Sequence, residues 1–145
     1  CGFTATCYGV SRLLGNTNRW DADKVAAKPL MSVAQWRIWH ESGMDVGSHT
    51  CTHADLNALE EDVARAEITQ SKRELENAIG CEVRHFCYPY GRYKPVHAAL
   101  VKQAGYVDSL NQYSVITQTK FPFMYRFQLK IWLSLKTTYK PLMFI

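Results

Sequence analysis

A chain of 145 residues with 47% hydrophobic and 21% charged side chains has the composition of a globular protein, with at most one domain and enough residues to bury a modest core. It shows neither an uncharged run of 18 residues nor a charged start followed by an apolar core, so no membrane span and no signal peptide is visible. The net charge of +4 does not indicate a nucleic-acid-binding domain. All 13 acidic residues lie at or before Asp108, and residues 1–119 carry 12 basic against 13 acidic side chains.

The first third of the chain predicts two strands separated by a helix. Residues 2–10, GFTATCYGV, are rich in β-branched and aromatic side chains and predict a buried strand. Residues 32–43 predict a helix, because Ser32 and Gln35 have the spacing of a capping box. Residues 44–49, MDVGSH, predict a short strand that enters a polar loop.

The next part continues the alternation. Residues 59–79 predict a long helix, residues 83–91 a third strand, residues 95–105 another helix and residues 106–110 a fourth strand. The long helix has one apolar stripe at helical spacing, which consists of Ala64, Ile68, Leu75 and Ile79. Strands that alternate with helices predict an α/β fold with a parallel sheet, in which functional groups gather at the carboxyl ends of the strands.

The chain changes character after residue 110. Residues 111–145 contain no Gly, Asp, Glu or His, and they are aromatic and basic without a clear period. We therefore expect a domain over residues 1–110, followed by a divergent tail whose role the sequence does not indicate. Contact of this tail with a membrane surface is an alternative that its basic and aromatic character allows.

The stretch GSHTCTH, residues 47–53, holds the strongest candidate for chemistry. His49 and His53 lie four residues apart, and neutral imidazoles are good ligands for zinc. No Glu follows the first histidine, which excludes the helical His-Glu-x-x-His protease motif. From spacing alone the signal is weak, and a pair of polar loop histidines without a metal is the favoured alternative. Cys51, between the two, could add a thiolate ligand.

The segments DVGSHTCTH, residues 45–53, and FCYPYG, residues 86–91, together resemble the NodB-type polysaccharide deacetylases of carbohydrate esterase family 4. The resemblance covers roughly residues 2–108. It implies a partial, distorted (β/α) barrel. It also implies a divalent metal, usually zinc, and an N-acetylated polysaccharide or oligosaccharide as the substrate from which acetyl groups are removed.

The resemblance also implies roles for single residues. His49 and His53 would bind the metal, and Thr50 would support them without touching it. The backbone N–H of Tyr90 would stabilise the oxyanion, and Tyr90 and Pro89 would line the substrate site. Trp20 could offer its ring face to a sugar. Alternatively, Trp20 anchors a loop and Tyr90 is a turn aromatic packed beside Pro89.

Three departures from the family pattern bear on activity. The chain has no Asp-Asp pair, which in the family supplies the third ligand and the general base, and no Leu-x-His, which supplies the general acid. Cys87 stands where many members have an Arg. We therefore hold two hypotheses. The chain is a truncated part of a metal-dependent N-deacetylase, incomplete by itself, or it is a catalytically inactive fragment that binds carbohydrate or a partner.

Overall fold

Four parallel strands form the centre of the molecule. The computed structural model describes residues 4–110, so the predicted tail lies outside the described residues. The strands are β1 (Thr6–Gly9), β2 (Asp45–Ser48), β3 (His85–Cys87) and β4 (Asp108–Leu110). They form one sheet in the order β1-β2-β3-β4, and each strand pairs in parallel with the next one along the chain. The prediction of a parallel α/β fold is confirmed.

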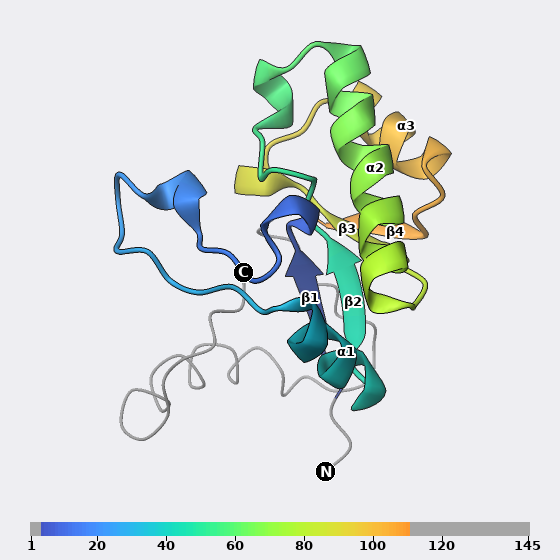
Figure 1. Ribbon diagram of the computed structural model, residues 1–145. Coiled ribbons are helices and arrows are strands. Elements are labelled where there is room, and N and C mark those ends of the chain that lie inside the picture. The colour runs from blue at the N-terminus through green and yellow to red at the C-terminus, as the bar shows by residue number, and fades with distance from the viewer. Residues whose placement is uncertain (1–3, 111–145) are drawn as a thin grey trace, which may run out of the picture.

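Helices connect the strands. The three α-helices are α1 (Val33–Glu41), α2 (Glu61–Ile79) and α3 (Pro95–Gln103), and each lies in one crossover (Figure 1). Short 3₁₀ turns are η1 (Ser11–Leu13), η2 (Arg19–Asp21), η3 (Leu56–Ala58) and η4 (Pro89–Gly91). The strand order does not reverse within the described residues. This sequential order is that of a (β/α) barrel segment, whereas a doubly wound sheet changes direction at a switch point.

The third strand is shorter than predicted. It ends at Cys87, and the Pro-Tyr-Gly segment forms η4 instead of continuing the sheet. Pro89 has no N–H to donate to a neighbouring strand, and Tyr90 adopts φ 59°, which is incompatible with an extended strand. The chain therefore turns sharply at the carboxyl end of β3.

The capping box that predicted helix α1 is present in the structure. The Ser32 hydroxyl accepts a hydrogen bond from the backbone N–H of Gln35 (3.4 Å), and the side-chain Oε1 of Gln35 accepts one from the backbone N–H of Ser32 (2.8 Å). Gly43 follows the helix at φ 82°, a conformation that glycine adopts without strain. The Trp36 side chain is buried in the core, so α1 packs on the sheet through the face that carries this residue.

The predicted apolar stripe of α2 is buried against the sheet. It also contains one polar residue, Ser71, which is fully buried. Its hydroxyl accepts a hydrogen bond from the Ser48 hydroxyl (2.8 Å) and donates one to the Ile68 carbonyl (2.9 Å). Since every polar group is paired, burial of Ser71 costs little and ties α2 to the end of β2.

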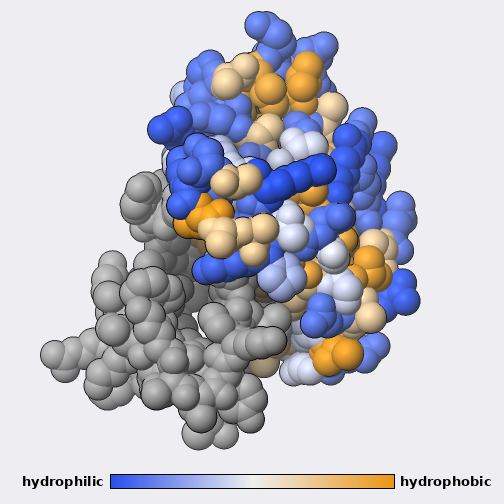
Figure 2. Space-filling view, turned by 60° about the vertical axis from the view of Figure 1, so that its left-hand side comes forward, coloured by the Kyte–Doolittle hydropathy of each residue, from blue (hydrophilic) through white to orange (hydrophobic). Residues whose placement is uncertain are grey.

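The face of the described residues in Figure 2 is mostly polar, and its apolar patches are small and separated. In the described part of the chain, no helix has both the length and the apolar character needed to cross a membrane. The four described cysteines are free. Cys7 and Cys51 are buried, whereas Cys81 and Cys87 are partly exposed.

Gly47 lies directly under the Tyr8 ring, at the register position that pairs the two residues on β2 and β1. A Cβ at Gly47 would lie 2.4 Å from two ring carbons of Tyr8. We expect Gly47→Ala to lower the free energy of unfolding by about 1–3 kcal/mol, because the ring must move or the strands must separate. Urea unfolding measures the change. The cost should fall sharply in a Tyr8→Ala background; an equal cost in both backgrounds contradicts the steric explanation.

Candidate metal centre

The candidate residues lie at one edge of the sheet. His49 directly follows β2, and Tyr90 lies in η4, directly after β3. Because parallel strands point the same way, as the arrows of β1 and β2 do in Figure 1, their carboxyl ends bring these loops together. Trp20, on η2, reaches the same place from the long β1–α1 connection. Residues far apart in the sequence therefore form one cluster.

The loop between the two histidines has an unusual backbone. Thr50 and His53 adopt φ 67° and 65°, which only glycine tolerates easily, and each such residue costs on the order of 1 kcal/mol. Specific bonds hold this conformation. The Thr50 hydroxyl accepts a hydrogen bond from the His53 N–H (3.0 Å), as expected for a residue that supports the pair. The backbone N–H groups of Ser11 and Arg12 donate to the carbonyls of Thr50 (3.2 Å) and Cys51 (3.0 Å).

The two imidazoles are close to each other and buried. Their ring centres are 4.7 Å apart at an interplanar angle of 72°, and the residues are 3% and 6% exposed. Two imidazoles that share a zinc ion through bonds of about 2.1 Å have ring centres on the order of 5 Å apart. The spacing of His49 and His53 is therefore compatible with a shared ion.

Hydrogen bonding sets the tautomer of His49. Its Nδ1 lies 2.8 Å from the carbonyl oxygen of Cys87, which can only accept, so Nδ1 carries the proton and Nε2 presents a lone pair. This arrangement is typical of histidines that bind metals. Nδ1 of His53 is buried and has no hydrogen-bond partner among the described residues. A buried nitrogen without a partner is costly, so this atom is an unsatisfied polar group of the site.

Aromatic rings enclose His53. The Trp20 ring stacks on it at 4.3 Å with an interplanar angle of 8°, and the Tyr90 ring meets it edge-on at 4.9 Å. This contact fixes the ring plane of His53. The stacking supports Trp20 as an anchor of its loop, and the residue also borders the site, while its contact with a sugar stays a prediction.

Beside His53 an open groove of about 530 Å³ separates the η2, β2–α2 and η4 segments. Arg92 forms an ion pair with Asp55 (2.9 Å) and lies 5.9 Å from the centre of the Tyr90 ring. The groove thus combines aromatic faces with hydrogen-bonding groups. Its lining residues are Trp20, Lys24, His53, Ala54, Asp55, Tyr90 and Arg92.

Burial keeps both histidines uncharged. It lowers the pKa of His49 to about 3, with a smaller contribution from His53, and it lowers the pKa of His53 to about 4. Neutral imidazole is the form that binds a metal. Cys51 differs: burial raises the pKa of its thiol to about 12, and Sγ points toward the Glu67 carbonyl (3.5 Å). Its side chain therefore does not join the pair.

The donor set fits zinc in type but is incomplete in number. Among residues 4–110 no group of three or more His, Cys, Asp or Glu side chains is placed to hold an ion. A catalytic zinc site usually has three protein ligands and an open position. His97 does not complete the set, because it is buried in α3 and its Nδ1 accepts a hydrogen bond from the Lys94 N–H (3.0 Å).

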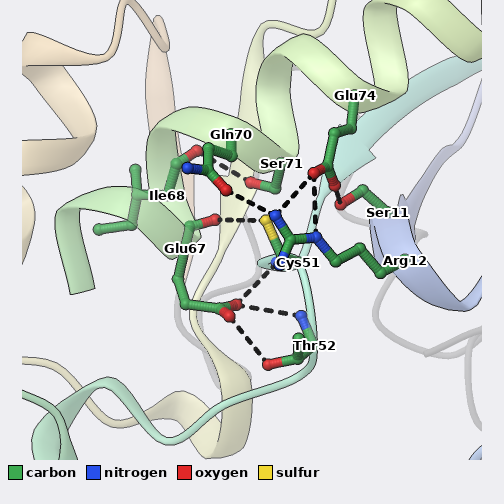
Figure 3. Close-up of polar contacts among 9 residues, drawn as sticks. All are labelled: Ser11, Arg12, Cys51, Thr52, Glu67, Ile68, Gln70, Ser71 and Glu74. Carbon is green, nitrogen blue, oxygen red and sulfur yellow. Dashed lines mark hydrogen bonds and ion pairs between the residues drawn. The ribbon is translucent and has the colours of Figure 1, made fainter. Parts of the chain in front are cut away.

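Sequence reasoning identified the central residues of the cluster but missed the groups that hold them. His49, His53, Thr50, Trp20 and the Pro89–Tyr90 turn do come together. Unexpected were the Glu67 carboxylate and the Arg12–Glu74 ion pair (Figure 3). No sequence pattern indicated either of these interactions, because charged residues on the polar face of a helix are common.

A fold with sequential parallel strands and a polar cluster at their carboxyl ends defines a class of α/β proteins whose sites lie in the loops after the strands. Residues 2–108 match the family model described as polysaccharide deacetylase, so the chain belongs to that family. This family is generally metal-dependent and comprises hydrolases of non-peptide carbon–nitrogen bonds.

Individual relatives agree with the family assignment. The chain is 23% identical over 105 residues to the putative polysaccharide deacetylase YxkH of Bacillus subtilis, covering 72% of this chain and 34% of that protein. It is similar to the crystal structure of BC0361, a polysaccharide deacetylase from Bacillus cereus, with 25% identity and a TM-score of 0.60 over 75% of this chain and 30% of the other.

A third relative shows the limits of fold similarity. BA3943 of Bacillus anthracis, described as a CE4 family pseudoenzyme, matches with a TM-score of 0.55 and 20% identity, over 74% of this chain and 33% of that one. The fold is therefore compatible with lost activity. The chain spans about a third of the length of each of these three relatives.

The depressed pKa values predict a pH dependence of stability for the metal-free protein. Below pH 6.5 the unfolded imidazoles bind protons while the folded ones do not, so stability should fall on the order of a few kcal/mol as the pH drops toward 4. The His49→Gln, His53→Gln double variant should show a flatter profile in urea unfolding at several pH values. His40→Gln, an exposed control, should follow the wild type. Parallel profiles for all three proteins would refute burial of neutral histidines.

Proposed function

We propose that residues 1–110 are part of a metal-dependent deacetylase that removes N-acetyl groups from a polysaccharide or oligosaccharide. In this proposal His49 and His53 are ligands of a divalent metal ion, most simply zinc. The observation that carries the proposal is the pair of buried, neutral imidazoles, one of them fixed in its tautomer by the Cys87 carbonyl. Family membership supports the reaction class.

Individual residues of this chain would have separate roles in the deacetylation reaction. A bound divalent ion would polarise the acetyl carbonyl and make its water more acidic. His49 would present Nε2, with the Cys87 carbonyl fixing its orientation. Tyr90 adopts φ 59° in the sharp turn after β3, and we assign its backbone N–H to the oxyanion that develops on the acetyl carbonyl.

The groove beside His53 would hold the sugar. Trp20 and Tyr90 offer apolar ring surface, and the buried Pro89 shapes the turn that presents Tyr90. Thr50 would act indirectly, because its hydroxyl accepts a hydrogen bond from the His53 N–H and so supports the backbone of that ligand. Residues outside this chain would have to provide the carboxylate ligand, the general base and the general acid.

A second candidate function is supported by the incomplete donor set. Without a third carboxylate or imidazole ligand within the described residues, the fragment could bind carbohydrate or a partner without catalysis. A pseudoenzyme among the relatives with the same fold is consistent with that alternative. The two candidates differ in whether the histidine pair still binds a metal and whether acetate is released.

Zinc titration of the full chain tests the proposal. Isothermal titration should detect one bound ion per chain, and the His49→Ala, His53→Ala double variant should weaken binding by more than about tenfold. His40→Ala changes an exposed histidine on α1 and should leave the affinity unchanged.

Binding that persists in the double variant would refute the ligand assignment. Acetate release from N-acetylglucosamine oligomers is then measured with zinc present. Release above a protein-free control would refute the inactive module, whereas a chain that binds zinc without releasing acetate keeps the metal site but lacks the carboxylate ligand and proton-transfer groups, which the described residues do not supply.

A further inference from the structure

We propose that Glu67, on α2, is a positioning residue that sets the relative orientation of His49 and His53. The inference rests on the proposed metal role of the pair, and it assigns to a helix carboxylate the task of shaping the loop between the two ligands. Glu67 touches neither histidine ring. It acts through the backbone of Cys51 and Thr52, the residues that connect them.

One carboxylate binds three donors of the loop. Oε2 of Glu67 accepts hydrogen bonds from the N–H of Cys51 (2.9 Å) and the N–H of Thr52 (3.0 Å). Oε1 accepts one from the Thr52 hydroxyl (3.0 Å). Figure 3 shows the carboxylate turned toward this short segment from the side of the helix. Bonds to a charged acceptor are stronger than bonds between neutral groups.

The loop needs such an anchor because its conformation is strained. Thr50 and His53 both have left-handed backbones, and neither is a glycine. Cys51 is 1% exposed, so its N–H would be buried without an acceptor if Glu67 were removed. Relaxation of the loop toward ordinary backbone angles would rotate His53 relative to His49.

Glu67 is itself held firmly. Its helix is fixed to the sheet by the buried neighbours Ala64, Ile68 and Ser71, the last of which bonds to the end of β2. The loop is also held from its other side, since N–H groups of η1 donate to the carbonyls of Thr50 and Cys51. The loop between the histidines is thus fixed between two rigid elements.

The experiment uses the full 145-residue chain with Glu67→Ala, Glu67→Gln and the control Glu61→Ala. Glu61 lies in the first turn of the same helix, and its carboxylate forms an exposed ion pair with Arg65 (2.8 Å). Gln keeps one acceptor oxygen, so Glu67→Gln should retain the two N–H contacts in part. Two quantities are measured: amide hydrogen exchange at Cys51 and Thr52 in metal-free protein, and zinc affinity by titration.

We expect Glu67→Ala to accelerate exchange of both amides by more than about tenfold while core amides of β2 are unchanged. Zinc affinity should fall about 10–100-fold, as it does when a group that orients a ligand is lost. Glu67→Gln should lie between wild type and Ala, and Glu61→Ala should match wild type. Unchanged zinc affinity in Glu67→Ala, or an equal loss in Glu61→Ala, overturns the inference.

A failure of the proposed metal role is distinguishable from a failure of this inference. If the wild type binds no zinc, the ligand assignment fails. The positioning role is then decided by nuclear Overhauser contacts between the rings of His49 and His53 in the metal-free chain. Their loss in Glu67→Ala but not in Glu61→Ala supports the role, and their retention in Glu67→Ala overturns it.

Discussion

The strained loop between His49 and His53 can exist only because hydrogen bonds fix it from both sides. Its carbonyls accept from the N–H groups of Ser11 and Arg12, and its own N–H groups donate to Glu67. Two left-handed residues in five would otherwise relax. The conformation of this loop therefore depends on η1 and α2, two elements that are separate in the chain and meet the β2–α2 loop at the carboxyl edge of the sheet.

The hydrophobic core gives these bonds their rigidity. α2 buries one stripe against the sheet, and the Ser71 hydroxyl in the middle of that stripe joins the end of β2. The Tyr106 hydroxyl donates to the Ile68 carbonyl (3.1 Å) and so connects the start of the β4 segment to the same helix. The Glu67 side chain, on the polar face of α2, is thus held at a fixed distance from the loop between His49 and His53. The packing of the core and the geometry of the loop between the histidines therefore both depend on α2.

Membership in the polysaccharide deacetylase family explains the parallel sheet and the position of the polar cluster, but it does not establish activity for this chain. The chain spans about a third of the length of YxkH and BC0361, and the described residues bring together two imidazoles without a carboxylate. Such a set can retain part of a metal site while lacking the groups that move protons. The proposed metal role and the catalytic role are therefore separable properties.

The sequence by itself determined the elements and the central pair. Helical spacing located α2, the Ser32–Gln35 box located α1, and the two quoted segments identified His49, His53 and Tyr90. Pro89 and Tyr90 shortened β3 in a way that strand propensity did not reveal. Only the tertiary structure decided that Trp20 stacks on His53 and that Glu67 holds the loop. Local patterns depend on neighbours in the chain, whereas these contacts depend on how separate elements pack, which no single segment encodes.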